Sequence, residues 1–266
     1  ASVPVADPYV RIDNTSSDVD HQIFLLYQQS QLPVLYSDTL SKSPLTILNP
    51  NYQIAGFNTS YIIKYLKKKA DILTGVTFVR DKLLPPLGTK IKLHSVLLID
   101  TLMTSQYYSA TYSVVTYFNV YQGISALGIA NIPRISTMSS TQLQAYKADI
   151  FTTLLLGPLN SGDILKNFNL VSAAYYNKYY YAGVTAAGYL TSADKTVYGF
   201  IPDGKETASY YASVDQTTDL KLFLSKILTL SDTDFKAQYG SYPLIMSKYS
   251  LLKTALTATG FDLTKI

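Results

Sequence analysis

The chain has 266 residues, of which 47% are hydrophobic and 15% are charged, with a net charge of +4 and no cysteine. Such a chain can bury a sizeable core, and it cannot form disulfides, thiolate metal sites or a cysteine nucleophile. Its few charges argue against nucleic-acid binding, which normally concentrates Lys and Arg on one face. Glu206 is the only glutamate, and His21 and His94 are the only histidines, so neither an H-E-x-x-H zinc motif nor a pair of catalytic glutamates can exist.

The first half of the chain predicts a leader, two helices and several strands. Residues 1–16 are polar and contain two prolines, so we expect an extended leader into a single domain over residues 17–266. Helices are predicted where apolar residues recur every three or four positions, and strands where β-branched and aromatic residues gather. These patterns predict helices over 17–31 and 59–74, and strands over 32–36, 90–99, 111–121 and 124–129.

The densest basic run, Lys67 to Lys69, lies within the second predicted helix. Ile62, Ile63 and Leu66 are expected on the buried side of that helix. A charged run on an amphipathic helix is usually a solvated face. We therefore interpret these lysines as surface residues rather than as a binding patch.

The stretch from Ser139 to Asn160 is predicted to hold the central helix of the fold. It opens with hydroxyl residues and a nearby glutamine, and Gly157-Pro158 is expected to close it. Because strands precede helices instead of alternating with them, the order favours an α+β fold with a small, mainly antiparallel sheet. The helix over 140–156 is expected to be buried through apolar residues at helical spacing, namely Leu143, Tyr146, Ile150 and Leu154.

Beyond this helix the chain predicts a turn-rich aromatic region and then helices. A turn is expected at residues 199–204, a helix over 217–230, a short helix capped by Ser231, and a last helix from Tyr242 to Gly260. The flanking acids Asp149 and Asp163 have no evident base or metal partner in the sequence.

Tyrosine is the most distinctive residue of the chain, with 24 copies and no tryptophan. Exposed tyrosines are common recognition residues because they are large, stiff and amphipathic. The run from 175 to 181 cannot be buried on one side of a helix, so it is the candidate binding segment, although core or oligomer packing is an equal alternative. Its tyrosines are Tyr175, Tyr176, Tyr179, Tyr180 and Tyr181.

Several short segments, by their order and spacing, carry a resemblance to a known family. They are Leu32 to Tyr36 after the first helix, Phe168 to Ser172 followed by Tyr175, Tyr198 to Phe200, Tyr211 to Ser213, Thr218 to Leu220, and Gly260 to Leu263. Together they resemble the zinc-metallopeptidase lipoproteins of the Bacteroidetes, which are associated with substrate import and have a gluzincin-like catalytic core. The resemblance implies a metallopeptidase (zincin)-like domain over residues 17–266.

The same resemblance shows which catalytic residues are missing. The family's H-E-F-x-H motif falls on residues 153–157, so Thr153 and Gly157 replace the zinc histidines and Leu154 replaces the general-base glutamate. Its later acidic ligand region falls near residues 218–219, where only Asp219 is acidic. Zinc catalysis needs three protein ligands and a polarised water. The resemblance therefore implies a pseudo-metallopeptidase with no zinc, no other cofactor and no catalytic residues.

The two histidines have simple explanations. His21, near Asp18 and Asp20, is expected in the polar first turn of a helix, where acidic residues suit the helix dipole. His94 lies in an apolar stretch and is expected to be a buried, hydrogen-bonded side chain within a strand.

Three function classes stay open at this point. We favour a non-catalytic accessory of nutrient import that binds peptide or glycan and acts with outer-membrane import components. The resemblance, with the start at Ala1, also implies a processed lipoprotein of the cell envelope, which contacts the membrane only through an N-terminal lipid anchor absent from this sequence. The alternatives are a hydrolase with an unrecognised site and a structural subunit whose tyrosines form an oligomer interface.

Overall fold

The computed structural model describes residues 7–42, 45–49, 61–109, 112–161, 163 and 165–266. Helices and small sheets occur together, which confirms the predicted α+β class. The chain packs as two compact units, one within residues 1–87 and 92–153 and the other formed by residues 88–91 and 154–266. The expectation of one zincin-like domain stays a prediction.

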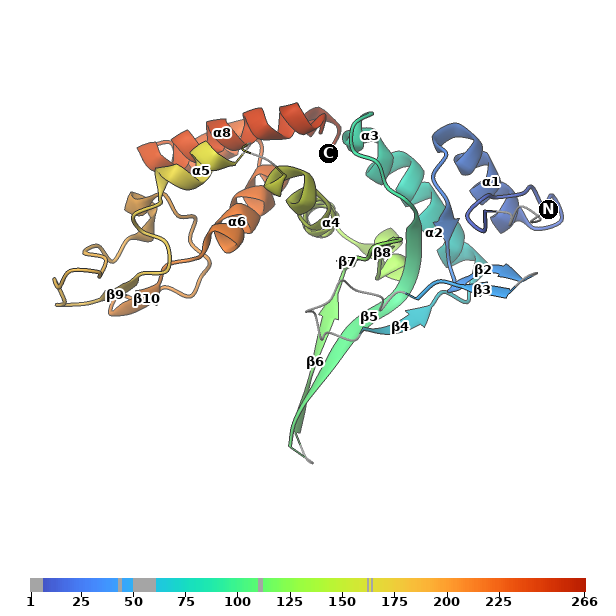
Figure 1. The fold of residues 1–266 in the computed structure, drawn as a ribbon, viewed down its shortest axis with the longest axis horizontal. Coiled ribbons are helices and arrows are strands. Elements are labelled where there is room, and N and C mark those ends of the chain that lie inside the picture. Colours follow the sequence, from blue (N-terminus) through green and yellow to red (C-terminus); the bar gives the residue numbers. More distant parts are fainter. Residues whose placement is uncertain (1–6, 43–44, 50–60, 110–111, 162, 164) are drawn as a thin grey trace, which may run out of the picture. The chain divides into compact units, whose positions relative to one another are not determined.

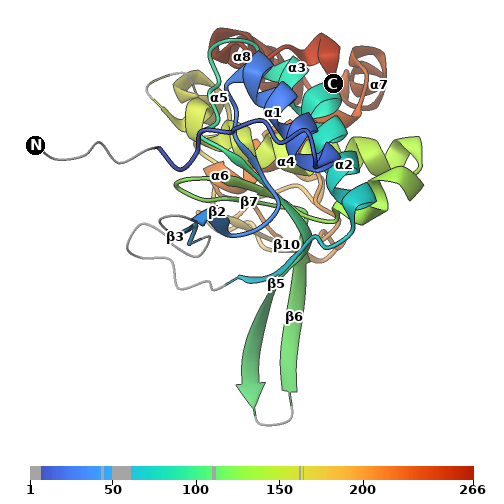
Figure 2. The ribbon, with the colours of Figure 1, turned by 90° about the vertical axis from the view of Figure 1, so that its right-hand side faces the viewer.

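One long strand, β5 (Val96–Ser109), organises the sheet of the first unit (Figure 1). Its first residues pair in parallel with two short strands, and its later residues pair antiparallel with two others. Figures 1 and 2 both show β5 and β6 continuing as a two-stranded ribbon beyond the rest of this sheet. The strands around β5 are β1 (Val34–Leu35), β4 (Ile62–Tyr65), β6 (Tyr112–Phe118) and β8 (Leu127–Ile129), and β8 pairs with β7 (Val120–Gln122).

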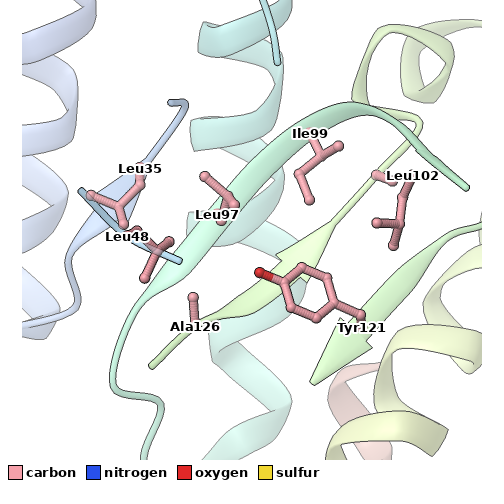
Figure 3. Packing of buried hydrophobic residues seen from close by; sticks show 8 residues of the cluster. Leu35, Leu48, Leu97, Ile99, Leu102, Tyr121 and Ala126 are labelled. Atoms are coloured by element: carbon pink, nitrogen blue, oxygen red, sulfur yellow. The ribbon is translucent and has the colours of Figure 1, made fainter. Parts of the chain in front are cut away.

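One hydrophobic cluster of the first unit lies against one face of this sheet (Figure 3), and residues on the other face, such as Val96 and Leu98, are buried as well. The ring of Tyr121 lies over Gly128, where any Cβ would collide with the ring, so the packing of the two strands requires a glycine. Around them lie buried aliphatic residues of β1, of β5 and of the loops that hold residues 48 and 126. They are Leu35, Leu48, Leu97, Ile99, Leu102 and Ala126.

The predicted helix over 59–74 is wrong for most of its length. Ile62 and Ile63 lie on strand β4, opposite residues of β5, and α2 (Lys69–Phe78) begins only at the last lysine of the run. The segment from Ile62 to Tyr65 alternates between exposed and half-buried residues, which is the period of a strand, and its β-branched residues favour that geometry. Lys67 to Lys69 are exposed, as expected, and residues 59–60 lie outside the described residues.

Other strand predictions are correct in place but not in length. The strand predicted over 90–99 begins only at Val96 and continues to Ser109. The strand predicted over 111–121 is divided at Asn119 into β6 and β7, and Thr111 lies outside the described residues. Two short strands, β2 (Thr39–Lys42) and β3 (Leu45–Ile47), form a further antiparallel pair that the sequence patterns did not predict.

The first helix, α1 (Asp18–Ser30), confirms its prediction closely. The side chain of Ser17 accepts a hydrogen bond from the backbone N–H of Asp20 and so caps the helix. At the other end Gln31 adopts a left-handed conformation, and its N–H donates to the carbonyl of Tyr27. Val19, Ile23 and Leu26 form its buried stripe, at the apolar spacing from which the helix was predicted.

Helix α2 runs without interruption into a π-helical turn, η1 (Val79–Leu83), and then into α3 (Leu84–Leu87). A 3₁₀ segment, η2 (Ile132–Thr137), packs against α2. The first part of α4, up to Thr153, belongs to the same unit.

The central helix, α4 (Ser140–Asn160), is longer than predicted, and of the four residues expected to be buried Tyr146, Ile150 and Leu154 are buried whereas Leu143 is half-buried. Ser139 and Gln142 form a reciprocal cap: each side chain accepts a hydrogen bond from the other residue's backbone N–H, at 3.2 and 2.8 Å. Pro158 lies inside the last turn and does not end the helix, which closes at Asn160. Its buried residues include Tyr146, Ile150, Phe151, Leu154, Leu155 and Leu159.

The second unit is built from helices with one small sheet. The three predicted C-terminal helices are confirmed, with Asp215 and Ser231 as side-chain caps and Gly260 in the left-handed conformation after the last helix. Its elements are the last part of α4, from Leu154, followed by α5 (Lys166–Val171), β9 (Tyr179–Tyr181), η3 (Lys195–Tyr198), β10 (Tyr210–Ala212), α6 (Gln216–Thr229), α7 (Asp232–Tyr239), α8 (Pro243–Thr259) and η4 (Leu263–Lys265). No helix within the described ranges combines the length and the apolar character that a membrane span requires.

Replacement of Ser139 by Ala should lower the free energy of unfolding by about 1 kcal/mol, because the N–H of Gln142 loses its acceptor. Denaturant titration followed by circular dichroism measures this change. Ser140→Ala is the matched control, since the structure gives that hydroxyl no hydrogen bond. Equal destabilisation by both variants would contradict the capping role.

Candidate functional site

The strands β9 and β10 pair antiparallel and bring together tyrosines from distant parts of the sequence. Tyr181 lies opposite Tyr210, and Tyr180 lies opposite Tyr211. Side chains alternate between the two faces of a strand, and directly opposite residues share a face. The hairpin therefore has one face carrying Tyr179, Tyr181 and Tyr210 and another face carrying Tyr180 and Tyr211.

The first face is exposed and consists of tyrosine rings in contact with one another. The exposed fractions are 47% for Tyr179, 39% for Tyr181 and 39% for Tyr210, and Tyr189, which is 41% exposed, joins them at the side. The ring centroids of Tyr181 lie 4.9 Å from Tyr210 and 5.7 Å from Tyr189, and those of Tyr179 and Tyr210 lie 6.2 Å apart. We call these four residues the tyrosine platform.

Backbone contacts fix the fourth ring beside the hairpin. The N–H of Leu190 donates to the carbonyl of Tyr179 at 2.8 Å, and residues 180 and 190 form a parallel bridge. Tyr189 is therefore held along the edge of β9. Desolvation and then the neighbouring tyrosines raise the pKa of Tyr181, so its phenol stays neutral well above pH 7.

The second face anchors the hairpin to the interior. The ring of Tyr180 stacks on that of Tyr211 at 5.3 Å, and Tyr211 is only 1% exposed. The hydroxyl of Tyr211 donates to the carbonyl of Ser192 at 2.9 Å. The ammonium of Lys195 lies 5.4 Å from the ring of Tyr211. That lysine is itself buried and forms ion pairs with Asp203 at 3.1 Å and with Glu206, the only glutamate, at 2.5 Å.

The remaining two candidate tyrosines also point inward. Tyr175 packs its ring against Tyr198 at 4.8 Å, and Tyr176 packs against Phe200 at 5.4 Å. The hydroxyl of Tyr176 donates to the Oδ2 atom of Asp219 at 2.6 Å. Both side chains are half-buried and belong to the same core as Tyr180.

The structure thus divides the predicted binding segment. Tyr179 and Tyr181 are on the platform, whereas Tyr175, Tyr176 and Tyr180 pack against the core, which is the alternative that the sequence left open for this run. Sequence reasoning missed Tyr189 and Tyr210. The adjacent aromatic residues Tyr210 and Tyr211 were the available signal for a second aromatic strand.

A buried ion pair lies at the base of this region. The side chains of Asp219, on α6, and Lys248, on α8, are both 0% exposed, with Nζ 2.6 Å from Oδ2. The ammonium also donates to the carbonyl of Gly199 at 3.0 Å. Around Lys248 Nζ stand four aromatic rings at 4.7 to 5.5 Å, those of Phe168, Tyr176, Phe200 and Phe223.

Burial works against the charge on both partners. Desolvation raises the pKa of Asp219 and lowers the pKa of Lys248, while their mutual contact opposes both shifts. The Oδ1 atom of Asp219 is buried without a hydrogen-bond partner. Lys248 and Tyr176 therefore both contact the carboxylate through its Oδ2 atom.

The positions that the family resemblance singles out do not meet as a catalytic group. On α4, Thr153 is half-buried, Leu154 is buried and Gly157 is exposed, and Asp219 is held by Lys248. Across the described residues, no three His, Cys, Asp or Glu side chains gather as ligands of one metal ion.

The other polar candidates take part in local contacts. The Nδ1 atom of His21 lies 2.7 Å from Asp13 Oδ1, so its acidic partner is Asp13. His94 is exposed and precedes β5, with its ring 4.5 Å from that of Tyr9, so the prediction of a buried strand histidine is wrong. Asp149 accepts a hydrogen bond from Asn119, and Asp163 is exposed near the end of α4.

The chain matches no known protein family, no curated protein and no solved structure. The resemblance to the zinc-metallopeptidase lipoproteins therefore stays a prediction. The tyrosine platform and the buried ion pair are the features of the second unit that bear on its function.

Replacement of Asp219 by Asn should lower the free energy of unfolding by about 3–5 kcal/mol, because it leaves the ammonium of Lys248 buried without a counter-charge. The double variant Asp219→Asn with Lys248→Met should recover most of that loss. Denaturant titration of the three proteins tests this. Asp18→Asn, in an exposed pair with Lys69, is the matched control and should change little. If the double variant is as unstable as the single one, the ion pair is not the cause.

The two faces of the hairpin should respond differently to truncation. Tyr211→Ala should cost about 3–5 kcal/mol of folding free energy, because it empties a buried aromatic site. Tyr179→Ala should cost less than about 1 kcal/mol, because its ring is on the surface. Thermal and denaturant unfolding of both variants measures the difference, and similar losses would refute the division into an anchoring face and an exposed face.

Proposed function

We propose that the protein is a non-catalytic binding protein and that the tyrosine platform is its ligand-binding surface. The observation that carries this proposal is the contiguous exposed face formed by Tyr179, Tyr181, Tyr189 and Tyr210. Contiguous exposed aromatic surface on a folded domain is a common mark of an interaction site.

The chemistry of the platform suits a glycan first and a peptide second. Ring faces offer apolar contact area, and phenol hydroxyls both donate and accept hydrogen bonds. Tyr179 and Tyr210 are inclined by only 20° to each other, so they present nearly parallel rings to the flat faces of sugar units. The same surface can accept apolar side chains of an extended peptide.

The rings of the platform are also held by contacts within the protein in the absence of ligand. Each ring contacts another ring, and Tyr180 and Tyr211 fix the hairpin from behind. A tyrosine has only two side-chain torsions, and neighbouring rings already restrict them here. Preorganisation of this kind lowers the entropy cost of binding.

The proposal of a pseudo-metallopeptidase rests on the family resemblance and is supported by the environment of Asp219. This residue falls where the resemblance puts an acidic ligand, and the ammonium of Lys248 supplies the positive charge beside it. Thr153 and Gly157 offer no imidazole donors for zinc. We therefore propose a degenerate zincin-like fold that retains binding and lacks peptidase chemistry.

The cellular setting follows from the same resemblance. We propose a lipid-anchored protein of the cell envelope that presents its ligand to outer-membrane import components. In that setting a surface of exposed rings captures polymeric nutrients without altering them. The competing proposal, a structural subunit, assigns the same rings to an interface between copies of the chain.

The single variants Tyr179→Ala, Tyr181→Ala and Tyr210→Ala should each weaken ligand binding by about 1–4 kcal/mol, because each removes a contact ring. Binding is measured with an array of oligosaccharides and peptides, followed by titration of the best ligand. Tyr117→Ala removes a tyrosine that is 66% exposed on β6, outside the platform, and is the matched control.

Light scattering on the same proteins separates binding from assembly. A parent protein that binds nothing and forms an oligomer that the platform variants dissociate would favour the structural subunit. Platform variants that bind as well as the parent would also overturn the proposal.

A further inference from the structure

A candidate interaction surface lies on the first unit, where β5 and β6 continue as a two-stranded ribbon (Figures 1 and 2). The register of the pair runs from Leu102 opposite Phe118 to Ser109 opposite Tyr112. Among the described residues, β5 is the only strand that pairs with β6, so the other edge of β6 has no strand beside it. An open edge of this kind is a template for pairing with a further strand.

The side chains of β6 are exposed on both faces of the ribbon. Successive residues of a strand point to opposite faces, and every residue from Ser113 to Tyr117 is exposed. The apolar side chains among them are 37% exposed at Val114, 43% at Val115 and 66% at Tyr117. Because an isolated two-stranded ribbon is only marginally stable in water, a further strand would stabilise this part of the molecule.

The side chains that usually protect an edge strand are absent from β6. Natural edge strands carry charged residues, lysine above all, or proline. Residues 101–133 contain no Lys, Arg, Asp, Glu or His, although the chain has 22 Lys and Arg and 18 Asp and Glu elsewhere. The strand itself, YSVVTYF, consists mostly of β-branched and aromatic residues, which favour pairing in a sheet.

The lack of charge favours a second copy of the same strand as the partner. A charged strand that pairs with its own copy meets the same net charge, and like charges opposite each other destabilise a sheet. Because β6 is uncharged, it avoids this repulsion. A partner of opposite charge, in contrast, would find no complementary charge along this edge.

We propose that the protein forms a dimer in which β6 pairs antiparallel with β6 of a second copy. The interface is then isologous and produces a four-stranded ribbon in the order β5, β6, β6 and β5. Val115 is the middle residue of β6, so a register centred on it pairs the largest number of residues and puts the two copies of Val115 opposite each other. In this register Val114 lies opposite Thr116, and the large ring of Tyr117 lies opposite the small side chain of Ser113.

Sedimentation velocity of the full chain over a dilution series tests the dimer. The parent should sediment as a dimer when concentrated and as a monomer after dilution. Val115→Lys should weaken association about tenfold or more, because two ammonium groups would face each other across the two-fold axis. Val197→Lys, in η3, changes a similarly exposed valine (46%, against 43% for Val115) and is the matched control that should associate like the parent. Circular dichroism checks that both variants are folded.

The absence of cysteine from the chain allows a second test, which also reports the register. Directly opposite residues of an antiparallel pair have Cα atoms about 4.5 or 5.5 Å apart, within the range that a disulfide spans. Val115→Cys should therefore form a disulfide-linked dimer on mild oxidation, whereas the control Val197→Cys should stay monomeric. A mixture of Val114→Cys and Thr116→Cys should give a linked heterodimer, because these positions face each other in the proposed register.

A parent protein that stays monomeric at every concentration would overturn the proposal, and so would a dimer that Val115→Lys leaves intact. Failure of Val115→Cys to cross-link, or equal cross-linking of Val197→Cys, would also contradict it. The proposal does not depend on ligand binding by the tyrosine platform, so Tyr179→Ala and Tyr210→Ala should leave this dimer intact. Dissociation by those two variants would assign the dimer to the platform instead.

Discussion

The buried contact between Lys248 and Asp219 is the interaction on which the second unit depends most. Removing two charges from water costs several kcal/mol for each, and only close geometry and further polar contacts offset that cost. Here the offset comes from the carbonyl of Gly199, the hydroxyl of Tyr176 and four surrounding rings. The pair therefore fixes α6, α8 and the segment before β9 in one arrangement.

This constraint explains why a surface of tyrosines can be well defined on a small hairpin. An isolated two-stranded sheet is marginally stable in water. The hairpin of β9 and β10 is stabilised from its inner face by Tyr180 and Tyr211, and Tyr176, three residues before Tyr179, is tied to Asp219. The same alternation that buries one set of rings forces the other set outward, so anchoring and exposure are two results of one pattern.

Sequence reasoning succeeded where the signals were local. The apolar spacing of the helices, the hydroxyl residues that open the central helix and the cap at Ser231 gave correct positions for α1, α4 and α7. It failed at β4, because Ile62, Ile63 and Leu66 fit a helical stripe as readily as a strand. Pairing with β5, about forty residues later in the chain, makes this segment a strand rather than a helix. A short stretch of sequence carries no information about such long-range pairing.

The candidate site could also be predicted only in part from the sequence. Composition identified tyrosine as the distinctive residue, but which rings are exposed depends on the register of β9 with β10, since a shift by one residue would exchange the two faces. Lys248 stands 29 residues from Asp219, and no motif marks it as a partner. In the folded protein, the ammonium of Lys248 supplies the positive charge beside the carboxylate of Asp219. The contacts of this one carboxylate with Lys248 and Tyr176 thereby join α6 to α8 and to the segment before β9, a result of tertiary packing that no short stretch of sequence could have shown.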